Sequence, residues 1–413
     1  MVIHGSLFKL LPFGVFILLF KFGAGLHFTL LAPLGARVFD VWVVGLLIGG
    51  AALLQLLLDV PAGFALDRFG YLRLLWVTTA AFIVATSVLI AGLTPMTFIA
   101  TLFLGAFGWL FYGPGVDAYL LSMTPVEYAG RVVSMRDILV SIGIVFSTAL
   151  LAFMLSIPVP MIGGIIAVIL LCALLAGIMS PRDRVSVHAE KKVPTHHYHV
   201  RRHHVGHIFH AIWKLNPASG LLLLSGLAGS IFYAVIWFVV PLLLDSPSGA
   251  SLPSVALGIF DFAVAVLGFF FGRLADKWNQ KWLIFFGLLL FSVTGALLGF
   301  STHVWFLVLG FMATAGDELS GLALWAWMDR LDKSHREDGL IAGVISFFQD
   351  LGWTIGPLVA GFLYGAIGPA WTIAVGAIPI LITWMISFWT LAPLAVAPGM
   401  TAIRPPHRRK HKE

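Results

Sequence analysis

Two stretches of this chain share a pattern of glycine, acid and base. GFALDRFGYLR runs from Gly63 to Arg73, and GRLADKWNQKW runs from Gly272 to Trp282. In each stretch the glycine is followed four residues later by an aspartate and a base, Asp67–Arg68 in the first and Asp276–Lys277 in the second. Repetition of one pattern at a spacing of roughly 210 residues predicts a chain built from two similar halves.

A second pair of stretches supports the duplication. DILVSIG, from Asp137 to Gly143, resembles DLGWTIG, from Asp350 to Gly356, at nearly the same spacing as the first pair. Two local similarities at one spacing favour a repeated unit over a chance match.

The composition indicates a membrane protein made of packed helices. Of 413 residues 60% are hydrophobic and only 11% are charged, whereas an ordinary soluble domain has roughly 25% charged residues. The 43 glycines and 21 prolines fit membrane helices, in which both residue types are tolerated. The single cysteine, Cys172, excludes an internal disulfide.

Apolar segments long enough to cross a bilayer recur along the whole chain. About twelve are predicted, with cores at 11–33, 41–64, 74–93, 97–121, 132–155, 160–180, 217–243, 253–273, 281–300, 304–327, 340–364 and 370–392.

The basic residues fall on one side of this map. All but about two of the 25 Lys and Arg lie in the tails or in the loops that follow even-numbered spans; Arg37 lies on the other side and Lys21 within a span. The positive-inside rule then places both termini in the cytoplasm of a plasma (inner) membrane protein. Because the basic residues flank apolar segments, the net charge of +6 indicates orientation in a lipid bilayer and no nucleic-acid partner.

The longest connection, Pro181 to Asn216, divides the spans into six and six. We expect an N-terminal half over 1–180, a cytoplasmic His-rich linker over 181–216, a C-terminal half over 217–395 and a basic cytoplasmic tail over 396–413.

The first loop resembles the signature of the major facilitator superfamily, G-x-x-x-D-[RK]-x-G. The matching residues are Gly63, Asp67, Arg68 and Gly70, with Arg73 after them and Asp59 before them in a DVPAG variant. The second copy keeps Gly272, Asp276, Lys277 and Lys281 but has Asn279 in place of the second glycine. Asparagine tolerates a left-handed turn better than most residues, so a left-handed turn is expected there.

The resemblance covers essentially the whole chain and implies an all-α membrane protein with twelve transmembrane helices in two pseudo-symmetric six-helix halves. It also implies gating contacts at the cytoplasmic seam. In the superfamily the loop aspartate meets the start of helix 11, and a basic residue meets an acid in helix 4, which by position is Asp117. Tyr71 stands where that base is common, so Arg68 or Arg73 is expected to pair with Asp117. Alternatively, these residues only orient and pack the loop.

Two repeat-matched acids belong to the same gating set. Asp137 follows Arg136 and Asp350 follows Gln349, so both are interpreted chiefly as pins between helices. Asp261, in helix 8, is solitary and its sequence context indicates no role.

Charges inside spans are costly, so they usually face a cavity or a partner. Lys21 lies about ten residues into helix 1, and helix 10 carries the adjacent acids Asp317 and Glu318. In the superfamily, helices 1, 4, 7 and 10 line the central cavity. Adjacent helical residues point about 100° apart, so one acid is expected to face the cavity and the other a neighbouring helix. Lys21 then handles solute or protons; the alternatives are a static ion pair that fixes helix packing, or snorkelling to an interface.

Several other residues on cavity helices are weaker candidates. His27 titrates near neutral pH and could relay protons, although a lone histidine is more often a packing residue. Trp109, Tyr112, Tyr233 and Trp237 could stack against a solute, although aromatic residues in spans more often face lipid or core.

The run HHYHVRRHHVGHIFH, from His196 to His210, would put five histidines on one helix face. Imidazoles at this spacing can bind a metal. An amphipathic surface helix near anionic lipid is favoured, because no cysteine or carboxylate joins the run. No metal and no cofactor are therefore expected.

These features predict a secondary active transporter of a small solute that works by alternating access, with protons as the coupling ion. Lys21 favours an anionic or zwitterionic solute, and function as a monomer is expected. A non-transporting sensor or receptor and an uncoupled facilitator remain the alternatives. An enzyme is not expected, because the spans contain no metal-ligand cluster, no phosphate loop and no nucleophile beside a base.

Overall fold

The computed structural model describes residues 10–124, 129–181, 217–245, 255–331 and 338–391. The expected His-rich linker and basic tail lie almost wholly outside the described residues. The described chain is helical, and its N-terminal half consists of α2 (Leu11–Ala36), α3 (Val41–Phe69), α4 (Tyr71–Val88), the short η1 (Leu89–Ala91), α5 (Pro95–Trp109), α6 (Tyr112–Met123), α7 (Ala129–Ser156) and α8 (Val159–Ile178). The C-terminal half consists of α10 (Pro217–Leu244), α11 (Gly258–Lys277), α12 (Gln280–Leu298), α13 (His303–Leu331), α14 (Asp338–Gly376) and α15 (Ile378–Leu391).

These helices confirm the predicted fold class. Ten stretches of the described residues are long and apolar enough to cross a membrane. One of them, Ile345–Thr390, has 46 residues, and the break at Gly368 divides it between two crossings. The shorter apolar stretch Gly258–Gly268 in α11 completes the twelve predicted spans.

Prolines account for two interruptions of the spans. Pro114 lacks an amide hydrogen and its ring clashes with the carbonyl four residues earlier, which belongs to Leu110; the fourth span accordingly breaks between α5 and α6 at Leu110 and Phe111. Gly368 has φ 79°, ψ 169° inside α14 and is followed by Pro369. A left-handed glycine followed by proline ends one helix and starts the next.

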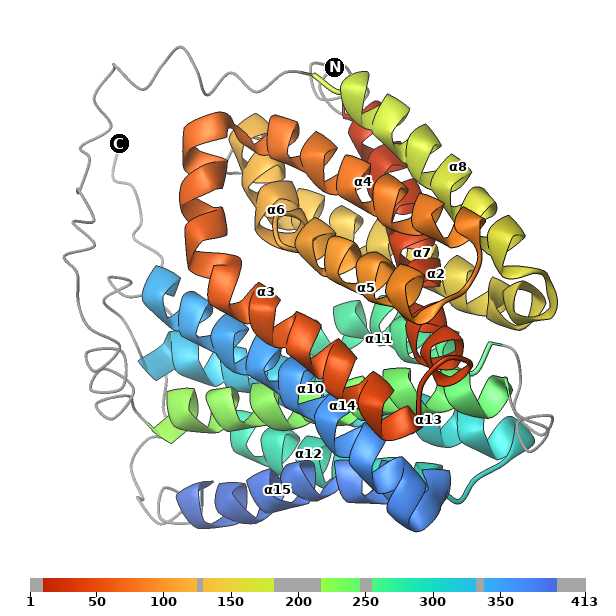
Figure 1. Cartoon of the computed structure of the whole chain (residues 1–413). Coiled ribbons are helices and arrows are strands. Elements are labelled where there is room, and N and C mark those ends of the chain that lie inside the picture. The colour runs from red at the N-terminus through yellow and green to blue at the C-terminus, as the bar shows by residue number, and fades with distance from the viewer. Residues whose placement is uncertain (1–9, 125–128, 182–216, 246–254, 332–337, 392–413) are drawn as a thin grey trace, which may run out of the picture.

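The two halves lie side by side, with α3 and α14 at the seam (Figure 1). Further contacts between the halves are made by α7 with α11 and by α2 with α10. Figure 1 shows α3 running beside α14 and then turning away from it toward the N-terminal half. Pro61 lies in this last part of α3, and proline is a common cause of such bends.

Small residues allow the halves to touch at one end. A Cβ on Gly45 of α3 would lie 2.5 Å from the Pro357 carbonyl oxygen and 2.8 Å from the Gly361 Cα of α14, so only glycine permits this backbone approach. We call the end that contains this contact, together with the final residues of α2, α7 and α10, the closed end. We call the opposite end, where α3 passes into α4 at Gly70, the signature end.

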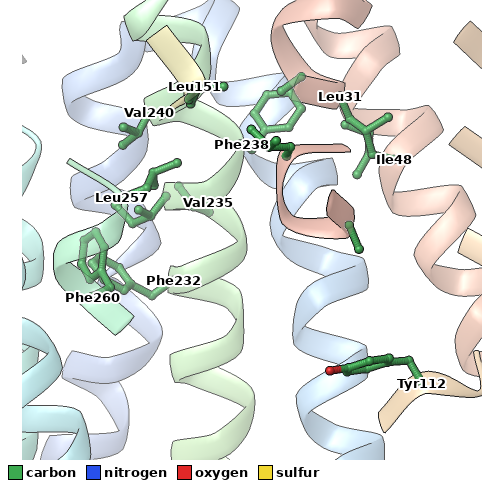
Figure 2. Close-up of a cluster of buried hydrophobic side chains, with 14 of the residues drawn as sticks. Leu31, Ile48, Tyr112, Leu151, Phe232, Val235, Phe238, Val240, Leu257 and Phe260 are labelled. Atoms are coloured by element: carbon green, nitrogen blue, oxygen red, sulfur yellow. The ribbon is translucent and has the colours of Figure 1, made fainter. Parts of the chain in front are cut away.

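Large apolar side chains fill the interior of both halves. Phe232 and Val235 of α10 lie in one buried cluster with Phe260 of α11 and with Leu257, the residue before α11 (Figure 2). The same cluster contains residues of the N-terminal half, such as Leu31 of α2. The core is therefore continuous across the seam near the closed end.

Candidate functional site

A cavity of about 550 Å³ lies between the two halves. Its lining comes from α2, α3, α5 and α7 of the N-terminal half and from α10, α11, α13 and α14 of the C-terminal half. Of the expected solute and coupling residues it is lined by Lys21, His27, Trp109, Tyr233, Trp237 and Asp317. Tyr112 and Glu318 are not among the residues that line it.

Two aromatic rings hold the Lys21 ammonium group. Its Nζ lies 4.4 Å from the centre of the Trp109 ring and 4.7 Å from that of Tyr112. The break at Pro114 separates the helices that end at Trp109 and begin at Tyr112, and so contributes to this geometry. Cation–π contacts of this kind contribute about 0.5–2 kcal/mol each, with the larger value for desolvated groups.

The counter-charges of Lys21 differ from those expected. The ion pairs found among the described residues do not include Lys21. Asp261 of α11 is the carboxylate whose charge acts most strongly on Lys21, and Asp117 of α6 acts less strongly. Asp261 also lines the cavity. Asp261, which is solitary in the sequence, is therefore not isolated in the fold, because α11 of the other half brings its charge toward the lysine.

The adjacent acids of α13 point to different surroundings. Asp317 lines the cavity, and the Tyr233 hydroxyl of α10 donates a hydrogen bond of 3.1 Å to its Oδ2. Glu318 points toward α11, where a Cβ on Gly268 would lie 3.3 Å from Oε1. The rotation between neighbouring helical positions produces this division of roles.

His27 is buried in the cavity wall with its polar atoms unsatisfied. It is 3% exposed, and neither ring nitrogen has a hydrogen-bond partner among the described residues. Gly105 of α5 leaves the space that the imidazole fills, because a Cβ there would collide with the ring. Its edge meets Phe82 at 5.4 Å between ring centres. Buried polar groups normally have partners, and the backbone of Thr101 is a hydrogen-bonding group that acts on this imidazole.

A group of aromatic rings from three helices forms another part of the wall. Phe28 of α2 lies 5.8 Å from the ring centre of Trp237 of α10 and 5.8 Å from that of Trp353 of α14. All three residues line the cavity. Sequence reasoning included Trp237 but missed Phe28 and Trp353, because no local pattern predicts which apolar faces converge.

Asp59 of α3 and Asp350 of α14 form a carboxyl pair across the seam. The two carboxyl groups come from different halves and act on each other, and Asp350 also lines the cavity. Asp59 lies two residues before Pro61 of α3. Two ionised carboxylates that lie close together repel each other.

The acid of the fourth span has a different partner from the one expected. Asp117 lies 3.1 Å from the guanidinium of Arg136 on α7, and Asp137 lies 3.3 Å from the same group. The expectation that Arg68 or Arg73 pairs with Asp117 is wrong in this structure. Arg136 reaches Asp117 from the adjacent helix, whereas the Arg68 guanidinium lies 5.4 Å from the ring centre of Phe69.

The signature loops differ in their turns. Gly70 has φ 89° between α3 and α4, a conformation that favours glycine. Asn279 has φ −71°, so the left-handed turn expected there is wrong; its side chain instead accepts a hydrogen bond from the Lys281 amide and caps α12. A Cβ on Gly63 or Gly272 would meet nothing within 4 Å. The side chains of Asp67, Asp276 and Lys277 lie outside the described residues.

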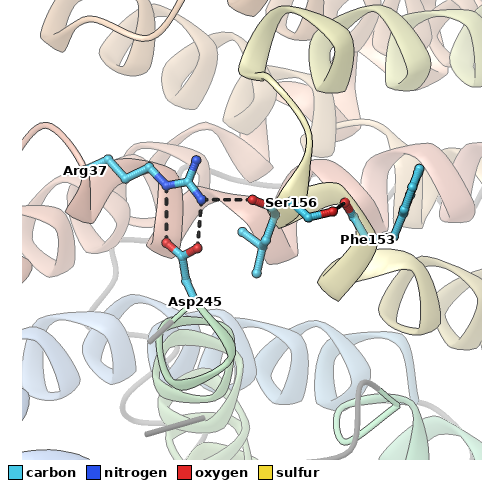
Figure 3. Close-up of polar contacts among 5 residues, drawn as sticks. Arg37, Phe153, Ser156 and Asp245 are labelled. Carbon is cyan, nitrogen blue, oxygen red and sulfur yellow. Dashed lines mark hydrogen bonds and ion pairs between the residues drawn. The ribbon is translucent and has the colours of Figure 1, made fainter. Parts of the chain in front are cut away.

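An ion pair at the closed end was missed by sequence reasoning. Arg37, which follows α2, contacts both carboxylate oxygens of Asp245, which follows α10, at 2.7 and 3.2 Å (Figure 3). The same guanidinium donates to the Leu155 carbonyl near the end of α7 at 3.3 Å. The contact joins the halves. One feature of the sequence could have indicated this ion pair. Arg37 is the basic residue that lies on the opposite side of the membrane from the other loop Lys and Arg residues.

Known proteins resemble this chain in sequence and in fold. The family model of the Major Facilitator Superfamily matches residues 13–260 and 222–412. The MFS-type efflux transporter pyiT of Pyricularia grisea is 30% identical over 111 residues, which are 27% of this chain and 18% of that protein. The aligned region therefore spans less than a fifth of the fungal transporter.

Solved transporter structures share the architecture. The nucleoside transporter NupG superposes with a TM-score of 0.68 at 13% identity, over 94% of this chain and 98% of that one. A variant of NupG with one aspartate changed to alanine gives a TM-score of 0.64 at 14% identity with the same coverage. Identity this low supports a shared fold only.

Proposed function

Because this chain belongs to the Major Facilitator Superfamily, we propose that it is a secondary active transporter that moves a small solute by alternating access of the cavity between its halves. The family makes the protein an integral membrane transporter and not an enzyme. The observation that carries alternating access is the cavity itself, which is lined by both halves while the closed end is sealed by Arg37 and Asp245.

The charge map supports the orientation of this cycle. With both termini in the cytoplasm, as the positive-inside rule favours, the signature end faces the cytoplasm and the closed end faces the outside. This conformation is then the inward-facing one of a plasma-membrane protein. We retain the two six-helix halves at 1–180 and 217–395 as the units that rock, within a monomer.

The Asp59–Asp350 pair supports proton coupling. Asp59 and Asp350 bring carboxyl groups of different halves together at the seam, and two ionised carboxylates held close to each other repel. Rocking of the halves separates α3 from α14 and would expose the pair to water. Lys21 and Asp317 in the cavity add charged groups whose surroundings change in the same motion.

The solute occupies the cavity among the lining residues. The lining disfavours a purely anionic solute, because Asp261, Asp317 and Asp350 line the cavity together with Lys21. The same solute can contact a proton acceptor at His27, the flat ring of Trp109 and the hydroxyl group of Tyr233.

Proton flux into liposomes tests this function. The purified chain is reconstituted with a pH-sensitive dye inside the vesicles, and solutes chosen by a thermal-shift screen are added. We expect solute-dependent proton movement, and we expect it to be abolished in a variant that combines Asp59→Asn with Asp350→Asn. Solute binding without any solute accumulation would contradict transport and support a sensor. Accumulation that ignores an imposed pH gradient would indicate an uncoupled facilitator.

A further inference from the structure

We infer that the cavity recognises aromatic amines, with the ammonium group at Asp317 and the ring against Phe28, Trp237 and Trp353. The inference rests on the proposed function and names the class of solute. Three features support it. They are the carboxylate of Asp317, the spacing of Tyr233 and Trp237 along α10, and the surroundings of Lys21.

Among the residues that the structure describes, Asp317 is a cavity carboxylate that belongs to no ion pair. The charge of Lys21 acts on Asp261, and Asp59 acts on Asp350. The hydrogen-bond partner of Asp317 is the neutral hydroxyl of Tyr233. A hydroxyl stabilises a carboxylate but does not neutralise it, and a buried charge is costly unless a cation accompanies it. A protonated amine in the cavity would supply that cation.

The aromatic wall begins one helical turn away from this acid. Tyr233 and Trp237 are four residues apart on α10, so they lie on one face with a rise of about 6 Å between them. Phe28 and Trp353 stand beside Trp237 at 5.8 Å from Phe28 to each tryptophan. An ammonium group bound at Asp317 therefore has aromatic surfaces at the distance of an ethyl or propyl chain. Tryptophan faces also attract cations directly.

The surroundings of Lys21 disfavour an anion as the primary ligand. Its ammonium group already lies over the rings of Trp109 and Tyr112 and feels the charge of Asp261 across the seam. An anion would have to compete with that carboxylate. The cavity lining holds one lysine and three aspartates, so its field favours a cation.

The first experiment measures binding on the full chain in detergent, independently of transport. Tritiated 2-phenylethylamine is the probe in a scintillation proximity assay. Three unlabelled competitors each change one feature: phenylacetate reverses the charge, 2-phenylethanol removes it, and 2-cyclohexylethylamine removes the aromatic ring. We expect phenylacetate and 2-phenylethanol to compete at least tenfold more weakly than the amine, and the cyclohexyl amine severalfold more weakly.

Variants of the chain locate the binding site. The competition experiment uses the unmodified chain, so its result does not depend on whether a variant folds. Asp317→Asn is expected to weaken amine binding at least tenfold, and Trp237→Leu severalfold. Glu318→Gln is the matched control, because it removes the same charge from the next position of α13, outside the cavity lining, and it should leave binding unchanged.

Two results would overturn the inference. One is competition by phenylacetate as strong as that of the amine; the other is amine binding that Asp317→Asn leaves intact in a folded protein. Failure of the proposed function looks different. Saturable amine binding without accumulation in vesicles would leave the ligand class standing and remove transport, whereas accumulation of other solutes without amine binding would do the reverse.

Discussion

The closed end and the signature end of the molecule use their charges in opposite ways. At the closed end, Arg37 and Asp245 come from different halves, and the backbones of α3 and α14 touch at Gly45. At the signature end, Arg136 serves Asp117 and Asp137, and all three residues belong to the N-terminal half. Among the described residues, the Arg37–Asp245 ion pair therefore joins the halves at the closed end, whereas the ion pairs of Arg136 lie within one half. That asymmetry is the expected signature of one state of a two-state transporter.

The largest effect on the closed end should come from adding one methyl group to Gly45. A Cβ there would lie 2.5 Å from a carbonyl oxygen of the other half, and overpacking of this kind costs about 1–3 kcal/mol. Gly45→Ala should lower the thermal stability of the purified protein. Gly50 lies in the same helix with nothing within 4 Å of its Cβ position, so Gly50→Ala should instead stabilise by up to about 1 kcal/mol. Equal effects of the two variants would contradict a backbone contact across the seam.

Breaking the Arg37–Asp245 ion pair should have a smaller effect on the closed end than Gly45→Ala. The pair is bidentate but partly exposed, with side-chain exposures of 34% and 24%, so about 1 kcal/mol is expected. In a background with Cys172→Ala, a cysteine introduced by Leu31→Cys reports access to the cavity, which Leu31 lines. Arg37→Ala should raise its labelling by a membrane-impermeant thiol reagent about fivefold. Unchanged labelling would contradict a role of the Arg37–Asp245 ion pair in keeping the closed end shut.

Charge reversal is the control for this prediction. The double variant Arg37→Asp with Asp245→Arg restores an ion pair across the seam, so labelling should return toward the level of the unmodified chain. Persistent high labelling in the double variant would show that the residues matter for some other reason than their pairing.

At the signature end the prediction concerns which arginine forms the ion pair with Asp117. A double-mutant cycle of Arg136→Ala with Asp117→Asn, read from thermal stability, should give a coupling of about 0.5–1 kcal/mol, because the Asp117 side chain is 42% exposed. The matched cycle of Arg68→Ala with Asp117→Asn should give none. Coupling to Arg68 in place of Arg136 would mean that the family pattern, and not the contact across α6 and α7, describes this chain.

The two ends also differ in what the sequence could predict. The number of spans and the duplication follow from local patterns, because apolar length and repeated motifs are local properties. The Arg37–Asp245 pair joins residues 208 positions apart, and no pattern around either residue specifies the other. The sequence predicted Lys21 as a cavity residue, but its aromatic partners depend on where Pro114 breaks a helix, and its nearest counter-charge depends on how α11 faces α2.

The smallest effect on stability is expected where the two ends communicate, at Lys21. Its charge is felt by Asp261 across the seam and by Asp117 toward the signature end, so it links both charge arrangements. Lys21→Met removes two cation–π contacts but also removes a buried charge, and these terms oppose each other. We expect the free energy of unfolding to change by less than about 1 kcal/mol, as measured by denaturant titration in detergent, while transport in vesicles is lost. Lys21→Arg, which keeps the charge, should retain part of the transport. A marked loss of stability with normal transport by the remaining folded protein would instead make the lysine a packing pin, and the asymmetry between the ends would then be maintained without it.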